Sequence, residues 1–141
     1  MIIVTGGTGF IGSNILAGLE KSGYHDLVVV DYMSNDERWK NIAKRELAHI
    51  VLPDQMPAFL EKHKSEIDAI IHMGAISTTT ETDVDLIVKT NQQLSWYLWE
   101  FCRDNNVRFI YASSAATYGD GSNGFDDNDD LEYLNKLRPL N

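Results

Sequence analysis

The sequence predicts an α/β protein whose parallel sheet is doubly wound, with helices on both faces. Three observations predict this fold. Short apolar segments of strand length alternate with amphipathic segments of helical length as far as residue 112. Three glycines follow the first apolar segment at the spacing of a dinucleotide-binding turn, and an aspartate ends the second apolar segment.

The first turn runs from Thr5 to Gly12, directly after the strand expected at residues 1–4. Gly6, Gly9 and Gly12 permit a tight turn, a close approach of a pyrophosphate to the backbone, and close packing of the next helix on the sheet. The N–H groups that begin this helix would face the phosphates. The apolar residues that share one face of the helix are Ile11, Ile15, Leu16 and Leu19.

The second strand is expected at residues 27–30 and ends in Asp31. This aspartate follows the last glycine by roughly 20 residues, the separation at which a carboxylate binds a ribose 2′-hydroxyl. A glycine turn without a ligand is the alternative, and the combination of strand, glycines, helix and acid disfavours it.

A helix is expected from Asp36 to Leu47, with Trp39, Ile42 and Ala43 on its inner face. Its cationic side chains would lie near the adenosine end of a dinucleotide, or would form a solvated surface. Among them, Arg38 is closest to the loop that would surround the ribose.

Further strands are expected at residues 49–52 and 67–72, with a helix between them that buries Met56, Phe59 and Leu60 and ends near Lys64. The loop Met73 to Ser77 then leaves the carboxyl end of a strand, where open α/β sheets bind ligands.

A long helix is expected from Asp83 to Asp104, starting at a capping box in residues 82–85. Its inner face consists of Val84, Ile87, Val88, Asn91, Leu94, Leu98 and Phe101. Asn91 is the one polar member of that face, so it needs a partner, either a nearby loop or a ligand. Trp96 and Trp99 lie away from this face, which favours a helix contact between two copies of the chain.

The last strand is expected at residues 107–112, and it ends in Ser113 and Ser114. These hydroxyls could bind a substrate oxygen, although serines at strand ends are more often turn formers. The acidic segment from Asp120 onward is expected to be a solvated flexible loop. Asp126, Asn128 and Asp130 alternate as in a calcium loop, but neither the required glycine nor the final glutamate is present.

Composition restricts the partners of this chain. Its 141 residues suit one domain, and its net charge of −9 and pI near 4.7 argue against nucleic acid and anionic membranes. Cys102 is the sole cysteine and the four histidines lack metal-ligand spacing, so we expect neither a disulfide nor a metal site. With no signal segment and no apolar run of spanning length, we expect a soluble cytoplasmic protein.

The motifs together resemble the extended short-chain dehydrogenase/reductase family, in its nucleotide-sugar epimerase branch. The segments that carry this resemblance are Thr5–Gly12, Asp31, His72–Ala75, Asn91 and Ser113–Gly119. They occur in the family's order and cover nearly the whole chain. Within the branch, the segments 74–83, 111–119 and 138–141 look like those of the ADP-L-glycero-D-manno-heptose 6-epimerase subfamily.

The resemblance implies a Rossmann-type domain with a bound nicotinamide dinucleotide. Ser114 would position the substrate and its transient carbonyl, while Asn91 would support the cofactor side. The other residues implied to bind the cofactor are Gly6, Gly9, Phe10, Ile11, Gly12, Asp31, Tyr32, Arg38, Met73, Gly74, Ala75, Ile76 and Ser77. Asp31 favours NAD, whereas the heptose enzymes generally use NADP and Arg38 could bind its 2′-phosphate; we expect NADP, with NAD as the alternative.

The reaction implied is inversion of C6 of an ADP-heptose by oxidation and re-reduction, in the synthesis of lipopolysaccharide core precursors. The family's Tyr-x-x-x-Lys pair follows the segment that matches residues 138–141, and no tyrosine of this chain has a lysine four residues later. Oxidation of a carbinol needs a base, so we expect the N-terminal domain of an epimerase, residues 1–141, without the substrate domain and inactive by itself. Another nucleotide-sugar epimerase or dehydratase, such as a UDP-galactose 4-epimerase relative, and a non-catalytic dinucleotide-binding module are the alternatives.

Overall fold

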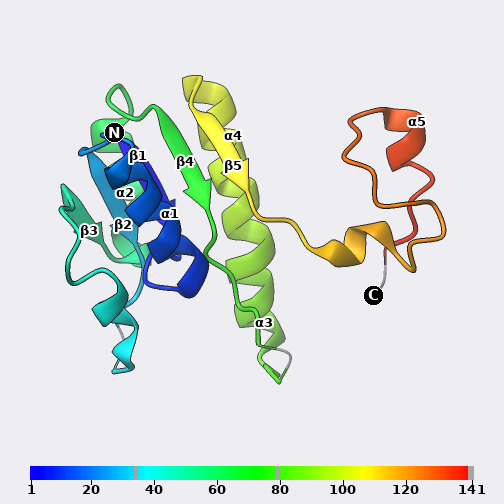
Figure 1. Cartoon of the computed structure of the whole chain (residues 1–141), viewed down its shortest axis with the longest axis horizontal. Helices are drawn as coiled ribbons and strands as arrows, with labels where there is room; N and C mark the ends of the chain where they lie inside the picture. The colour runs from blue at the N-terminus through cyan, green and yellow to red at the C-terminus, as the bar shows by residue number, and fades with distance from the viewer. Residues whose placement is uncertain (34, 79, 140–141) are drawn as a thin grey trace. The chain divides into compact units, whose positions relative to one another are not determined.

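A five-stranded parallel sheet organises the first 111 residues of the computed structural model, which describes residues 1–33, 35–78 and 80–139. Its strands are β1 (Ile2–Thr5), β2 (Leu27–Val30), β3 (His49–Val51), β4 (Ala69–His72) and β5 (Arg108–Tyr111). Their spatial order is β3-β2-β1-β4-β5 (Figure 1). The chain builds outward from β1 on one side and then crosses to the other, so the order reverses between β1 and β4. Ligands bind at such a reversal in open α/β sheets.

The register brings three strand ends level with one another. Thr5 of β1 lies opposite Val30 of β2 on one side and His72 of β4 on the other. The loops that follow these three residues therefore leave the sheet at the same edge, beside each other.

Helices cover both faces of the sheet, which confirms the predicted fold class. They are α1 (Phe10–Lys21), α2 (Met56–His63), α3 (Val84–Ile87), a π-helical segment (Val88–Gln93) and α4 (Leu94–Asn105). Ile3 packs in the cluster that contains Leu60 of α2 and Leu98 of α4, whereas its neighbour Val4 packs in the cluster with Leu16 of α1. Successive strand residues point to opposite faces. Because both faces are covered, β2 is a continuous apolar run.

The helix predicted for residues 36–47 is wrong. The structure has a 3₁₀ turn at Glu37–Asn41, which Asp36 caps by accepting from the N–H of Arg38. Trp39 is half exposed and Ala43 is exposed; Ile42 alone of the three predicted inner residues is buried. A single buried apolar side chain does not stabilise an amphipathic helix against the sheet, so the chain returns to β3 after the five-residue 3₁₀ turn.

The inner face predicted for the long helix is correct only in its second half. Leu98 and Phe101 are buried, but Val84 and Val88 are exposed. Figure 1 shows α3 beyond the ends of the strands, where the sheet offers no surface to pack against. The cap residue is Asp83, whose carboxylate accepts from the N–H of Leu86.

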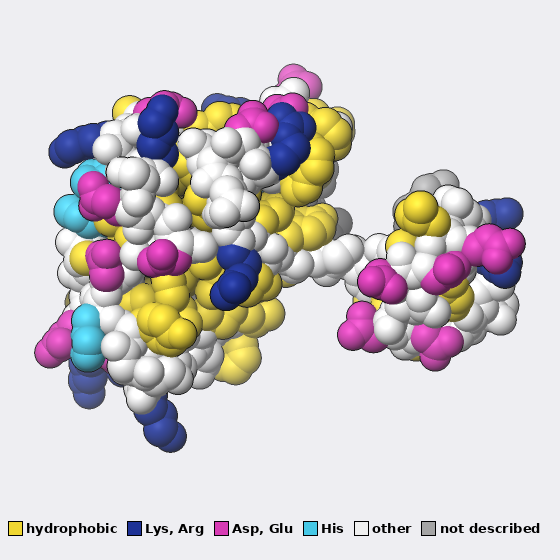
Figure 2. Space-filling model, turned by 90° about the horizontal axis from the view of Figure 1, so that it is seen from above, with side chains coloured by type: hydrophobic (Ala, Val, Ile, Leu, Met, Phe, Trp, Pro, Cys, Tyr) yellow, Lys and Arg dark blue, Asp and Glu magenta, His cyan; other side chains and the backbone are white. Residues whose placement is uncertain are grey.

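Residues from Ala112 onward form a second compact unit. It contains a 3₁₀ turn at Ala115–Tyr118 and the short helix α5 (Leu131–Leu134), with Leu137 buried inside. The sequence predicted only a loop here. Carboxylates dominate its charged surface in Figure 2, and one of them, Asp130, caps α5. The prediction of one domain over residues 1–141 stays a prediction.

Candidate dinucleotide-binding site

The glycine turn after β1 leaves no room for side chains at two of its predicted positions. Gly6 has φ +65°, and a Cβ there would lie 2.8 Å from the backbone N of Gly74. A Cβ on Gly12 would lie 2.3 Å from the carbonyl oxygen of Gly6. At Gly9 the same atom would only approach that carbonyl oxygen to 3.2 Å. Gly6 is therefore required for packing of the turn against the loop that follows β4, and Gly12 for packing of α1 against the turn, whereas Gly9 mainly keeps the approach to the helix open.

The first turn of α1 is suited to an anion. Gly9 is its N-cap without a side-chain capping bond, and the turn carries no acidic residue. The positive end of the helix dipole is thus not neutralised by a neighbouring carboxylate. Phe10 is 83% and Ile11 61% exposed, so both flank this helix end. Of the apolar residues predicted to share one face of α1, Leu16 is fully buried and Ile11 is exposed.

Asp31 is held against the glycine turn. Its Oδ2 accepts from the N–H of Thr8 at 3.0 Å and from the Thr8 hydroxyl at 2.5 Å, while Oδ1 accepts from the N–H of Tyr32 at 2.8 Å. Asn41 donates to the carbonyl of Thr8 at 2.8 Å. The carboxylate is thereby fixed beside the helix end, and the 3₁₀ turn is tied to the same loop. Sequence reasoning missed Thr8 and Asn41, and no signal in the pattern marks the amide of Asn41.

Arg38 and Tyr32 lie on the segment that follows Asp31. Arg38 Nε donates to Asp36 Oδ2 at 2.7 Å, and its side chain is half exposed. Tyr32 is also half exposed. Desolvation, followed by the nearby carboxylate of Asp54, raises the pKa of the Tyr32 phenol.

The loop after β4 is bound to both β1 and the long helix. Met73 N–H donates to the carbonyl oxygen of Thr5 at 3.2 Å, and Gly74 N–H donates to the Thr5 hydroxyl at 3.0 Å. Ile76 exchanges two hydrogen bonds with the side chain of Asn91, at 2.7 Å and 2.9 Å. Of the two partners expected for Asn91, a nearby loop or a ligand, the structure shows the loop. Ala75 and Ser77 are exposed at this edge of the sheet.

His72 is a buried residue of this site that sequence reasoning did not assign to it. Its ring lies between the hydroxyls of Thr5, 2.6 Å from Nδ1, and Ser95, 3.0 Å from Nε2. Burial lowers the pKa of this imidazole. The available signal was a histidine at the end of an apolar strand, where a buried ring needs two polar partners.

Ser114 belongs to the unit that begins at Ala112. Its hydroxyl caps the 3₁₀ turn there by accepting from the N–H of Ala116 at 3.2 Å. This is the turn-forming role that serine commonly has after a strand. Its predicted role toward a substrate stays a prediction.

Neither a metal centre nor a membrane span is visible in the part of the chain that the structure describes. Across residues 1–33, 35–78 and 80–139, His, Cys, Asp and Glu side chains do not gather in threes as a metal ion would need. Over the same residues, every helix is too short or too polar to cross a bilayer. Asp126 and Asp130, which alternate as in a calcium loop, lie apart from any such group, and Asp130 is occupied in capping α5.

Comparison with known proteins gives consistent relatives. The chain is 45% identical over 143 residues to the ADP-L-glycero-D-manno-heptose-6-epimerase of Fusobacterium nucleatum, and 48% identical to that of Nitratidesulfovibrio vulgaris. Each alignment covers 100% of this chain and 43% or 44% of the relative. The chain thus spans less than half the length of these relatives.

Solved structures of nucleotide-sugar epimerases share the fold. A UDP-glucuronic acid 4-epimerase from Bacillus cereus in complex with NAD matches 99% of this chain and 45% of that chain, with a TM-score of 0.73 and 25% identity. A UDP-N-acetylglucosamine 4-epimerase from Methanobrevibacter ruminantium matches 86% of this chain and 40% of that chain, with a TM-score of 0.70 and 30% identity. A model of the NAD dependent epimerase/dehydratase family matches residues 2–141. The chain belongs to the NAD dependent epimerase/dehydratase family.

Proposed function

We propose that the whole protein is an ADP-L-glycero-D-manno-heptose 6-epimerase and that residues 1–141 supply its dinucleotide site. The observation that carries the proposal is the uncapped start of α1 beside the fixed carboxylate of Asp31. The names of the relatives that are 40–48% identical support the sugar and the reaction. The enzyme would act in the cytoplasm, on a precursor of the lipopolysaccharide core.

The dinucleotide would lie across the edge where β1, β2 and β4 end. Its pyrophosphate would accept from the N–H groups that begin α1, between Phe10 and Ile11. The adenosine ribose would lie near Asp31 and Tyr32, and the nicotinamide end near the loop 73–77. When bound, the nicotinamide supplies the acceptor for a hydride and returns it; the residues of this chain bind and orient it.

NADP is the proposed cofactor and NAD is the alternative. A carboxylate beside the ribose favours the free 2′-hydroxyl of NAD, whereas a 2′-phosphate needs a nearby cation. Arg38 and Lys40 are the two cations of the 3₁₀ turn that follows Asp31, and Arg38, the nearer to Asp31 in the chain, is half exposed. Its guanidinium would give up a hydrogen bond to the Asp36 carboxylate and donate instead to the 2′-phosphate.

Calorimetric titration of the chain with NADP and with NAD tests the cofactor site. Arg38→Gln is expected to weaken NADP about tenfold, the loss of one charge-assisted hydrogen bond, and to leave NAD within twofold. Lys44→Gln, an exposed cation on the same segment, is the control. If the wild type binds NAD more tightly and Arg38→Gln changes neither affinity, NAD replaces NADP. If neither dinucleotide binds and Asp31→Ala changes nothing, the site itself is wrong.

Ser114 is proposed to bind the sugar hydroxyl or carbonyl at the reacting carbon in the whole protein. Residues 1–141 contain no Tyr-x-x-x-Lys pair, so we expect no epimerisation by this chain alone. Assay of the whole protein on ADP-heptose and on UDP-sugars separates this function from that of a UDP-galactose 4-epimerase relative. Activity on UDP-sugars alone would contradict the proposed substrate.

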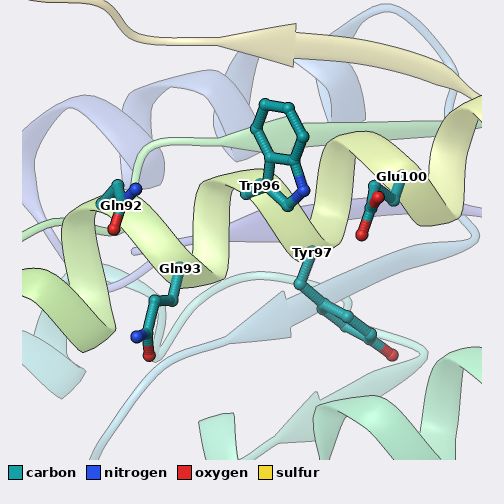
Figure 3. A pocket seen from close by; sticks show the side chains of 5 residues that line it. All are labelled: Gln92, Gln93, Trp96, Tyr97 and Glu100. Carbon is teal, nitrogen blue, oxygen red and sulfur yellow. The ribbon is translucent and has the colours of Figure 1, made fainter.

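The exposed aromatic side chains of α4 support self-association. Trp96 is 60% and Trp99 43% exposed, with ring centroids 5.2 Å apart. Trp96 and Tyr97 also line a hollow of about 440 Å³ with polar neighbours from the same helical stretch (Figure 3). Sedimentation of the wild type is expected to show a dimer that Trp96→Glu dissociates, whereas Trp39→Glu on the 3₁₀ turn does not. A monomeric wild type would contradict this interface.

A further inference from the structure

One chain of hydrogen bonds joins the glycine turn to the long helix through His72. Gly74 N–H donates to Thr5 Oγ1 at 3.0 Å, and Thr5 Oγ1 lies 2.6 Å from His72 Nδ1. His72 Nε2 lies 3.0 Å from Ser95 Oγ, which donates to the carbonyl of Asn91 at 2.8 Å. The Asn91 amide completes the path by pairing with Ile76. The path therefore begins and ends on the same loop.

The partners determine where the imidazole carries its proton. A carbonyl oxygen only accepts, so the single hydroxyl proton of Ser95 is used on Asn91. The contact between Ser95 Oγ and His72 then requires the proton on Nε2. A neutral ring with Nε2–H has a bare Nδ1, which accepts from the Thr5 hydroxyl. The Thr5 oxygen in turn accepts from Gly74 N–H, so each group has one consistent role.

The surroundings of the ring favour this neutral form. His72 is 3% exposed and Thr5 is 3% exposed. The side chains packed against the imidazole are Thr5 from β1, Ser95 from α4, and Phe109 and Tyr111 from β5, of which Tyr111 is titratable. A second ring proton at Nδ1 would turn two donors toward each other and leave the Thr5 hydroxyl proton without its acceptor.

We propose that His72, held as the Nε2–H tautomer, is a positioning residue that sets the loop Gly74–Ile76 against the glycine turn and the π-helical segment. The role toward a dinucleotide rests on the proposed function, because that loop is the proposed nicotinamide side of the site. The link between His72 and the loop consists of protein hydrogen bonds alone, so it does not depend on a bound cofactor. Asn91 and Ser95 lie at the junction of the π segment and α4, and single-turn π segments frequently occur at functional sites.

The first experiment is ¹⁵N–¹H NMR of the histidine rings in the 141-residue chain. We expect His72 Nε2 to be protonated and Nδ1 to be bare, and burial to lower the pKa of the ring below the ordinary histidine value. The amide resonances of Gly74 and Ile76 should shift with the His72 midpoint. An Nδ1–H tautomer, a mixture of both, or loop amides that ignore the His72 transition would overturn the proposal.

The second experiment tests transmission through Ser95, which does not bond Gly74 directly. Hydrogen exchange at Gly74 N–H is expected to be about tenfold faster in Ser95→Ala, as in Thr5→Val, and near the wild-type rate in Thr5→Ser. Asn105→Ala is the control, because Asn105 also donates to the carbonyl four residues earlier in α4, at 2.8 Å. Equal exchange in Ser95→Ala and Asn105→Ala would overturn the proposal. If exchange responds but no dinucleotide binds, the positioning role stands and the proposed cofactor function fails.

Discussion

Gly12 shows how strictly single residues determine the candidate site. Its missing side chain lets the first turn of α1 contact the glycine turn, since a Cβ there would lie 2.3 Å from the Gly6 carbonyl oxygen. Gly18 lies in the same helix, and a Cβ there would meet nothing within 4 Å. The two glycines therefore allow a matched comparison.

Gly12→Ala is expected to lower the free energy of unfolding by about 1–3 kcal/mol through overpacking, and to abolish dinucleotide binding. Gly18→Ala is expected to raise the free energy of unfolding by about 0.4–1 kcal/mol, because alanine restricts the unfolded chain and suits a helix interior. Urea unfolding followed by circular dichroism measures both variants. A Gly12→Ala protein as stable as the wild type would show that the turn can shift.

The residues of the site also show what sequence reasoning could and could not find. The glycines and Asp31 were predictable, because each occupies a position where backbone conformation or chain spacing demands that residue type. Thr8 and Asn41 were not, since they are 33 residues apart and meet only through a bend after β2. The half-buried Asn91 was recognised as needing a partner, but the pattern did not name Ile76.

At the scale of elements, α1 is tied at its far end to the segment before β3. Glu20 accepts from the N–H of Glu46 at 2.8 Å and from the guanidinium of Arg45. The Glu46 N–H first, and then Arg45, lower the pKa of the Glu20 carboxyl. Because the pKa in the folded state lies below that of the unfolded chain, the stabilisation is present above the unfolded value. It is lost as the pH falls through the folded value.

Glu20→Gln should consequently lower the urea midpoint at pH 7, relative to the wild type, and lower it less at pH 3. Glu61→Gln removes an exposed carboxylate that pairs with Lys64 three residues away, and exposed pairs contribute little. It should therefore change neither midpoint. A Glu20→Gln effect of equal size at both pH values would mean that lost packing, not charge, causes it.

For the whole molecule, the described residues divide after Tyr111, where β5 ends. The sheet, both apolar clusters and the proposed dinucleotide site all lie in residues 1–111, whereas the buried Leu137 lies in the second unit. Because the whole proposed site lies in residues 1–111, we expect a chain of these residues to fold. We expect its dinucleotide affinity to be within about threefold of that of the full chain, a difference below about 1 kcal/mol. Calorimetry of the two chains measures this. A 1–111 chain that unfolds would show that the second unit supports the sheet.

The sequence alone determined the fold class, the strands and the position of the first turn. These follow from local features: strand and helix periods, apolar runs buried on two faces, and glycines where side chains do not fit. The tertiary structure decided which side chains meet. Thr5 and His72, which are 67 positions apart, lie in contact, as do His72 and Ser95, which are 23 positions apart. Such contacts depend on sheet order and register, which place distant strand ends side by side and which no local pattern encodes.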